Sequence, residues 1–135
     1  MGWRIDDYEE ASGRSPVRDF IRGLEQADKA EAAALIKLLQ ELGNQIRPPR
    51  SKPLGHGLFE LRGKQVRIFY VFLPRQHAVL LDGIVKKRED IPTDVLERVR
   101  RLQKEVQGHE KKKKAEAAHD VAGRRDRQPR PPRKR

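Results

Sequence analysis

The stretch "FELRGKQVRIFYVFLPRQHAVLLDGIVKKRED", residues 59–90, decides the fold of this chain. Three apolar runs follow one another in it, and turn-forming residues separate them at Gly63-Lys64 and at residues 74–76. This pattern predicts three consecutive strands joined by hairpins. A two-residue turn at Gly63-Lys64 also predicts the register of the first hairpin. It pairs Arg62 with Gln65, Leu61 with Val66, and Glu60 with Arg67.

The middle run, residues 66–73, is apolar except for Arg67, which is typical of a strand covered on both faces. The third strand is expected at residues 77–85. Residues 47–57 hold three prolines and two glycines together with several cations, so they are expected to form a basic loop that leads into the sheet.

Helical patterns flank the predicted sheet. Ser15 can cap the free amides of a first helix, and Pro16 suits its first position, where a missing N–H costs nothing. Residues 27–42 repeat apolar side chains at helical spacing and stop at Gly43. A last helix is expected from Pro92 until Gly108 closes it. The fold class is therefore α+β, with a helical hairpin packed on the sheet and a C-terminal helix.

The charge distribution divides the chain into two parts. Residues 1–107 hold 20 Lys and Arg against 16 Asp and Glu, whereas residues 108–135 hold 11 Lys and Arg against 4 Asp and Glu. The formal net charge of the whole chain is +11. The second part has charge blocks, prolines and no apolar period, so we expect a folded domain at 1–107 and a disordered basic tail at 108–135. The strong positive charge favours a polyanionic partner such as nucleic acid.

Several classes of protein are disfavoured by composition. The chain has no Cys, so it has neither disulfides nor thiolate metal sites, and a reducing cytoplasm fits. No apolar run is long enough for a membrane span, and the N-terminus is acidic rather than signal-like. No spacing of His, Asp and Glu indicates a metal site, and no glycine-rich phosphate loop occurs.

Cations cluster around the predicted sheet. Successive side chains of a strand alternate between its faces, so the three consecutive cations that end the third strand cannot all point away from Arg67. With the basic loop before the sheet, they predict a concave surface that suits a phosphate. The candidate residues are Arg67, Lys86, Lys87, Arg88, Arg50 and Lys52.

Structural interpretations of the same residues stay open. Arg67 can be the cross-strand partner of Glu60, a pair worth up to about 1 kcal/mol. Lysines at a strand end also protect an edge against aggregation. His56 and His77 lie beside turns, where most histidines have no chemical role, and Asp82 can simply be hydrogen bonded.

The order of these motifs resembles a known family. "SPVRDFI", a second helix, "KPLGHGLFELR", "VRIFYVF", "VLLDGIVKKRED" and a closing helix are similar to the RelE/ParE superfamily of bacterial toxins, in particular its HigB-like, phage-derived branch. The resemblance spans roughly residues 3–105. It implies two helices packed on a small, curved antiparallel sheet.

The resemblance also implies an activity, ribosome-dependent cleavage of mRNA without metal or other cofactor. The 2′-hydroxyl attacks the neighbouring phosphate, which requires a base, an acid and cations on the phosphate. Arg67 and Lys87 match the family's phosphate-binding positions, and His56 is the candidate base or acid. The implied partners are mRNA, the ribosome and a cognate antitoxin, often a helix-turn-helix protein. No membrane partner is implied.

The chain departs from the nuclease pattern in two segments. The family's nucleases carry lysines where this chain has Leu58 and Glu60, and a tyrosine where it continues with Ile91, Pro92 and Thr93. A second hypothesis is therefore a non-catalytic, ParE-like toxin that binds DNA gyrase. A third is an inactive relative that holds nucleic acid through its tail.

Overall fold

The computed structural model of this chain describes residues 2–86 and 91–126, with side chains described up to residue 110. The chain divides into two compact units, residues 1–103 and residues 104–135. The elements follow in this order: β1 (Arg4–Asp7), α1 (Pro16–Arg22), α2 (Gln26–Leu42), the 3-10 helix η1 (Gly43–Gln45), β2 (Ser51–Gly55), β3 (Leu58–Arg62), β4 (Val66–Leu73), β5 (His77–Val85) and α3 (Thr93–Asp126).

The first unit is built on a five-stranded sheet with the order β1-β5-β4-β3-β2. The three strands predicted from the sequence form its centre as antiparallel neighbours, and β1 adds a parallel edge beside β5. The sheet is therefore mixed rather than wholly antiparallel. The α+β class predicted from the sequence is confirmed.

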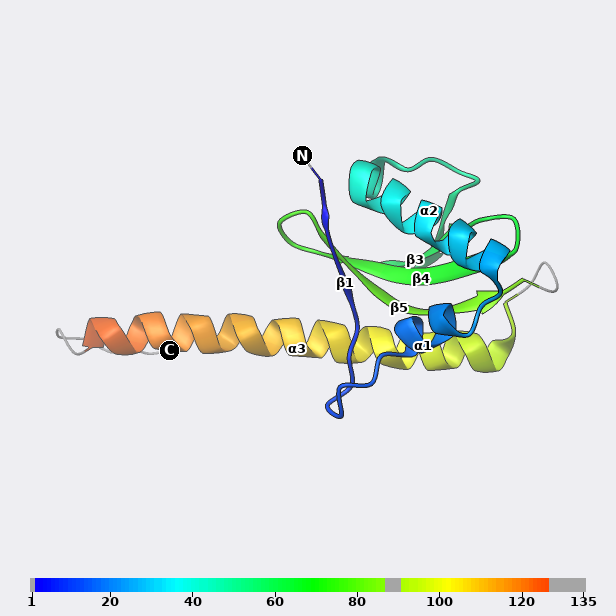
Figure 1. The fold of residues 1–135 in the computed structure, drawn as a ribbon. Helices are drawn as coiled ribbons and strands as arrows, with labels where there is room; N and C mark the ends of the chain where they lie inside the picture. Colours follow the sequence, from blue (N-terminus) through cyan, green and yellow to red (C-terminus); the bar gives the residue numbers. More distant parts are fainter. Residues whose placement is uncertain (1, 87–90, 127–135) are drawn as a thin grey trace. The chain divides into compact units, whose positions relative to one another are not determined.

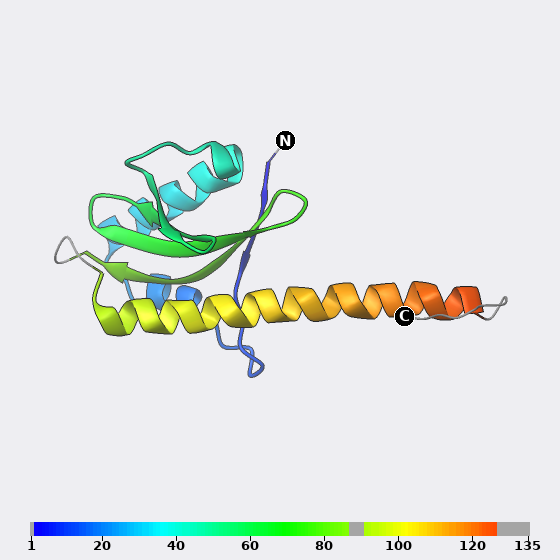
Figure 2. The same ribbon diagram turned by 180° about the vertical axis from the view of Figure 1, so that it is seen from behind.

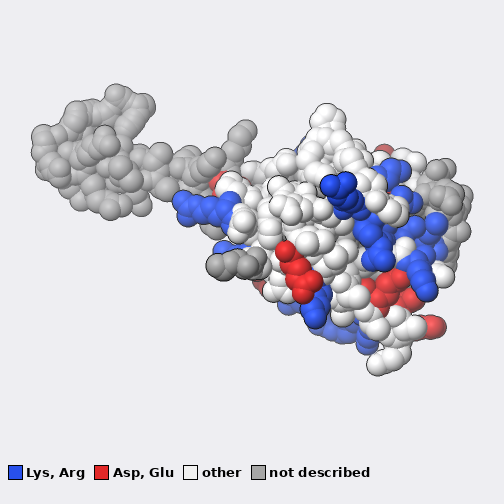
Figure 3. All heavy atoms as spheres, turned by 90° about the horizontal axis from the view of Figure 1, so that it is seen from above, with Lys and Arg blue, Asp and Glu red and all other residues white. Residues whose placement is uncertain are grey.

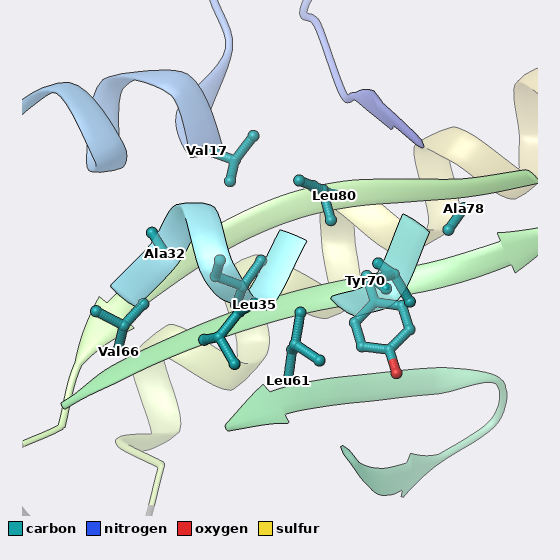
Figure 4. Packing of buried hydrophobic residues seen from close by; sticks show 10 residues of the cluster. Val17, Ala32, Leu35, Leu61, Val66, Tyr70, Ala78 and Leu80 are labelled. Carbon is teal, nitrogen blue, oxygen red and sulfur yellow. The ribbon is translucent and has the colours of Figure 1, made fainter. Parts of the chain in front are cut away.

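The two N-terminal helices pack on one face of the sheet, where their side chains join one core cluster. Figures 1 and 2, which view the molecule from the front and from behind, show α2 lying across the sheet. Ser15 caps α1 through its side chain, with Pro16 in the first turn, as the sequence predicts. Figure 4 shows the packing at this face, where buried apolar side chains of the helices meet those of the strands. The cluster consists of Val17, Ala32, Leu35, Leu39, Leu61, Val66, Ile68, Tyr70, Ala78 and Leu80.

Close packing at this face depends on Gly83 in β5. A Cβ atom at Gly83 would lie 2.4 Å from a ring carbon of Phe20 in α1 and 2.9 Å from the backbone oxygen of Arg67. The absent side chain therefore lets α1 approach β5 through the Phe20 ring.

The sequence missed strand β2, because residues 47–57 were expected to be a loop. Residues 51–55 instead pair with β3 as the edge strand. An edge strand tolerates Pro53, whose missing N–H has no ladder bond to make on the solvent side. The hydroxyl of Ser51, which is buried, is hydrogen bonded to the Tyr70 hydroxyl at 2.8 Å and ties this edge to the core.

The predicted end of the last helix is wrong. α3 does not stop at Gly108 but continues to Asp126. A glycine in a helix interior costs only about 1 kcal/mol relative to alanine, and the residues that follow are rich in Glu, Lys and Ala, all good helix formers. The structure has residues 108–126 in this helix rather than in the disordered basic tail predicted for 108–135, and residues 127–135 lie outside the described residues.

The register of the first hairpin also differs from the prediction. Arg62 pairs with Arg67, and Leu61 with Ile68, so the turn is two residues longer than expected. The cause lies far away in the sequence. The carboxylate of Glu31 in α2 accepts hydrogen bonds from three consecutive backbone amides of the turn, and it holds the turn open.

Candidate nucleic-acid interface

Cationic residues from three segments meet at the end of the sheet formed by the β3–β4 turn. The pairing of β3 with β4 places Arg62 directly opposite Arg67. The backbone N–H of Arg62 donates to the carbonyl of Arg50 at 2.7 Å, and that of Lys86 donates to the carbonyl of Gln65 at 2.5 Å. The structure thus brings Arg50, Lys86 and Arg67, all singled out from the sequence, to one end of the sheet.

A cleft opens at this end between α2 and the turn. Its volume is about 400 Å³, and it is lined by Glu31, Ala34, Leu35, Pro49, Arg50, Arg62, Gly63, Lys64 and Arg67. Four of these residues are cations, and Glu31 is the one acid among them. Figure 3, which views the molecule from the α2 side, shows Lys and Arg side chains gathering at one end with acidic atoms among them. The surplus of positive charge makes the cleft attractive to an anion.

Arg67 lies at the back of this cleft and is largely buried. Only 5% of its surface is exposed. Its guanidinium donates to the carbonyl of Gly63 at 2.5 Å and lies 3.5 Å from the carboxylate of Glu60. The structural interpretation of Arg67 as a partner of Glu60 is therefore confirmed, although the altered register makes the pair diagonal rather than directly opposite.

Glu60 joins two arginines in one buried cluster. Its second oxygen lies 3.6 Å from Nε of Arg62, and its side chain is 5% exposed. Two like charges directly opposite each other on neighbouring strands destabilise a sheet. The carboxylate between them offsets this repulsion, so that Arg62 and Arg67 can lie opposite each other on neighbouring strands.

The cations at the rim are more accessible. Arg50 and Lys64 are exposed, and Arg62 keeps a quarter of its side chain accessible at 25%. Within the described residues, the Arg50 side chain forms no ion pair. Lys64 lies close enough to Glu31 to help lower the pKa of that carboxyl. Arg50, Arg62 and Lys64 are thus the side chains best able to meet an external anion.

His56 does not belong to this cleft. It lies in the turn before β3, with a φ of 56° between two glycines that also have positive φ. Arg67 pairs with the last residue of β3, and the four steps from Leu58 to Arg62 span about 13 Å at roughly 3.3 Å per residue. The structure therefore places His56 at the opposite end of β3 from the clustered cations.

The turn that carries His56 is held by α3. Arg100 donates to the carbonyls of Leu54 and Gly55 at 2.6 and 2.8 Å, and Gln103 donates to the carbonyl of His56 at 2.7 Å. These bonds involve the backbone of the turn. They explain how an exposed histidine is kept in a left-handed conformation that costs on the order of 1 kcal/mol or more.

The remaining residues singled out from the sequence are not among the described residues that line the cleft. Lys52 is exposed and pairs with Glu60 across β2 and β3. Lys87 and Arg88 lie outside the described residues. Asp82, buried in β5, accepts from the backbone N–H of Gly83 at 2.8 Å and from Nε of Arg98 at 2.9 Å. Asp82 is thus hydrogen bonded, as the structural interpretation expected.

Sequence reasoning missed three charged residues of the cleft: Arg62, Lys64 and Glu31. Arg62 and Lys64 flank the predicted turn, and only the longer turn makes them part of one site. Glu31 gave no signal, because a single acid on an exposed helix face is ordinary. Burial raises the pKa of Glu31, but hydrogen bonds from the amides of Gln65, Val66 and Lys64 outweigh it and lower the pKa below its usual value.

The described part of the chain has neither a metal-binding cluster nor a membrane-spanning helix. Residues 2–86 and 91–110 contain no cluster of three or more His, Cys, Asp or Glu side chains able to hold a metal ion. No helix within residues 2–86 and 91–126 is both long and apolar enough to cross a bilayer.

The fold and the cleft together define a small α+β protein with an anion-attracting site at one end of its sheet. The chain belongs to the phage-derived Gp49-like family (DUF891), whose model matches residues 19–104. Among solved structures, one match is the crystal structure of the toxin-antitoxin complex RelBE2 from Mycobacterium tuberculosis. It has 17% sequence identity and a TM-score of 0.40, and it covers 64% of this chain and 100% of that chain. A comparison with curated proteins found no match.

Proposed function

We propose that this protein is the toxin of a type II toxin-antitoxin system and that it cleaves mRNA on the ribosome. Three observations support the proposal: membership of a phage-derived family, the resemblance of the motifs to RelE-type toxins, and the cation-lined cleft. The cleft carries the argument. It gathers Arg50, Arg62 and Lys64 around a space of about 400 Å³ that an RNA backbone can enter.

In the proposed reaction, a ribose 2′-hydroxyl attacks the adjacent phosphate, and the bond to the 5′-oxygen of the next nucleotide breaks. Negative charge grows on the non-bridging oxygens in the transition state, and fixed cations stabilise it there. In this proposal Arg62 and Arg50, which line the cleft, are the stabilising cations, together with Lys87 by resemblance. Arg67 acts mainly as a positioning residue, since its guanidinium is already bound to Glu60 and Gly63.

The proposed partners follow from this role. The toxin would act in the cytoplasm on mRNA bound to the ribosome, and a cognate antitoxin would neutralise it by covering the cationic end of the sheet. Many antitoxins of this class are helix-turn-helix proteins. The predicted basic tail would add affinity for ribosomal RNA by releasing counterions, so high salt should weaken that contribution steeply.

A second candidate function is a non-catalytic toxin of the ParE-like, gyrase-binding kind. One observation favours it. Of the described residues that line the cleft, Glu31 is the single candidate for a base, and its carboxylate is held by three amides that lower its pKa. A carboxylate in that state is a weak base. His56, the candidate from the sequence, lies at the other end of β3.

The test is to map RNA ends after brief induction of the protein in cells. The proposed function predicts transcripts cut within ribosome-bound regions, together with an immediate arrest of translation. Arg50→Gln should reduce cutting at least severalfold, because it removes an exposed cation of the cleft without touching the buried cluster. Arg75→Asn is the matched control, since it removes one exposed cation from the β4–β5 turn, and Asn tolerates the φ of 69° found there.

Intact transcripts during growth arrest would contradict the nuclease proposal. If the arrest then came with DNA damage signalling while translation continued, the gyrase-binding function would take its place. Equal cutting by Arg50→Gln and Arg75→Asn would leave the nuclease but remove the cleft as its site.

A further inference from the structure

The β3–β4 turn has the geometry of an anion-binding site. Backbone N–H groups of three consecutive residues, Lys64, Gln65 and Val66, all donate to the Glu31 carboxylate, at 2.5, 3.0 and 2.9 Å. Successive amides that point into one concavity form a nest, which binds carboxylate or phosphate oxygens. In this structure the anion in the nest is a side chain of the protein itself.

The position of Gly63 matches that of the Glu31 carboxylate in the turn. A Cβ atom at Gly63 would lie 2.7 Å from Cδ of Glu31 and 2.8 Å from its Oε2, which is closer than atoms can approach. The turn therefore leaves out a side chain at the place where the carboxylate lies. The backbone of the turn is thus open to an anionic group from one side.

The surroundings of the nest carry more positive charge than one carboxylate balances. Arg50, Arg62 and Lys64 line the same cleft as Glu31, with Arg67 behind them. Among the described residues, Glu31 is the one acid that lines the cleft. An anion with several charged groups would satisfy both the nest and these cations, whereas the single Glu31 carboxylate satisfies mainly the nest.

We propose that the β3–β4 turn is a phosphate-binding cradle for single-stranded RNA, and that Glu31 occupies it as an internal competitor until an RNA phosphate displaces it. The ligand class rests on the proposed function. A backbone phosphate and the Glu31 carboxylate each bring one negative charge to the nest, so the exchange is balanced there. Neighbouring phosphates on the same strand then reach Arg50 and Arg62, a gain through linked contacts that Glu31 cannot match.

The competitor also has a consequence for short anions. Inorganic phosphate offers no second group to the rim cations, so it must compete with a carboxylate that is tethered and always present. We therefore expect the wild-type cradle to exclude free phosphate and to admit RNA. Removal of the carboxylate should open the cradle to both.

The experiment measures binding of a fluorescent 2′-O-methyl oligoribonucleotide, which cannot be cleaved, by anisotropy. Glu31→Gln is compared with Glu41→Gln, an exposed acid at the other end of α2 that has the same charge change. The proposal predicts binding tighter than wild type by about tenfold for Glu31→Gln and by less than about twofold for Glu41→Gln. Equal affinities of the two variants for the oligonucleotide would overturn the proposal. Glu31 would then serve only to stabilise the conformation of the turn.

A measurement on the wild-type protein covers the case in which Glu31→Gln does not fold. NMR follows the titration of the Glu31 carboxyl with and without saturating oligonucleotide. Displacement predicts that the pKa of Glu31 rises toward its ordinary value when RNA is bound, while the amides of residues 64–66 remain hydrogen bonded. An unchanged Glu31 titration would refute the displacement.

These outcomes separate the inference from the proposed function, because the probe cannot be cut. Tighter binding by Glu31→Gln together with intact transcripts in induced cells would sustain the cradle and reject the nuclease. Cut transcripts together with equal affinities of Glu31→Gln and Glu41→Gln would reject the cradle alone.

Discussion

Substitution of Arg67 by methionine is expected to destabilise the protein before it affects any chemistry. The Arg67 side chain is 6% exposed and lies 3.5 Å from a Glu60 carboxylate that is itself 5% exposed. Methionine fills much of the same volume but carries neither charge nor donors. Glu60 then keeps Arg62 as its remaining ion-pair partner, at 3.6 Å.

The size of the effect follows from the burial of the pair. Removing one partner of a buried ion pair typically costs about 3–5 kcal/mol, because the other charge is left without compensation. We expect a loss of about 3 kcal/mol, the lower end of that range, because Arg62 still faces Glu60. With a urea dependence of about 2 kcal/mol per molar, the unfolding midpoint should fall by about 1.5 M. The free energy of unfolding of a small domain is about 5–15 kcal/mol, so the variant should still fold but with lower stability.

The assay is urea unfolding followed by fluorescence of Trp3, the one tryptophan in the chain, which packs against Phe72 with ring centroids 5.2 Å apart. Arg62→Met is the matched control. It removes the same kind of side chain from the same carboxylate, but the Arg62 side chain is 25% exposed, so its loss should shift the midpoint less. The double variant Glu60→Leu with Arg67→Met should recover part of the loss, because no unpaired carboxylate remains.

An unfolding midpoint for Arg67→Met equal to that of the parent would refute this reasoning. It would mean that the guanidinium contributes nothing to the fold and is held in place for a ligand. Loss of RNA cutting by an Arg67 variant could then be attributed to chemistry. With the expected loss of stability, such a result would report mainly on folding, and for this reason Arg50 is the better residue for testing function.

Three further predictions concern single contacts. Gly63→Ala should lower the melting temperature, since its Cβ would lie 2.7 Å from Cδ of Glu31, and an unchanged melting curve would show that the turn adapts freely. Ser51→Ala should lower the free energy of unfolding in urea by about 1–3 kcal/mol, because the buried Tyr70 hydroxyl loses its hydrogen-bond partner. It should also raise the pKa of Tyr70 further. Burial already raises that pKa, and the hydrogen bond from Ser51 that lowers it would be lost. Glu31→Gln should lower the melting temperature at neutral pH. The pKa of Glu31 is depressed in the folded state, so its stabilisation is present above the unfolded pKa and lost as pH falls through the folded pKa, and the difference from wild type should vanish in acid. A pH-independent difference would contradict that assignment.

Local patterns predicted much of the fold. The apolar runs of residues 66–73 and 77–85 became β4 and β5 with those bounds, and the Ser15-Pro16 pair begins α1. These features depend on periodicity and capping, which neighbouring residues determine. The pairing of Arg67 with Glu60 was also within reach, because both residues lie in one hairpin.

The features that sequence reasoning missed depend on distant contacts. The longer turn exists because Glu31, more than thirty residues earlier, accepts hydrogen bonds from three of its amides. Strand β2 is fixed by pairing with β3 and by the bond from Ser51 to Tyr70, although its own residues have loop-like composition. His56 was the candidate base or acid for the site that contains Arg67, but the extended β3 separates the two residues.

The central claim is that the cationic end of the sheet binds the phosphodiester backbone of RNA. The most direct measurement is the salt dependence of binding to the uncleavable oligonucleotide, with wild type, Arg50→Gln and Arg75→Asn compared. The account predicts that Arg50→Gln binds more weakly and that its slope of log affinity against log salt is smaller by about 1, while Arg75→Asn keeps the wild-type slope. Identical slopes for all three proteins would contradict it.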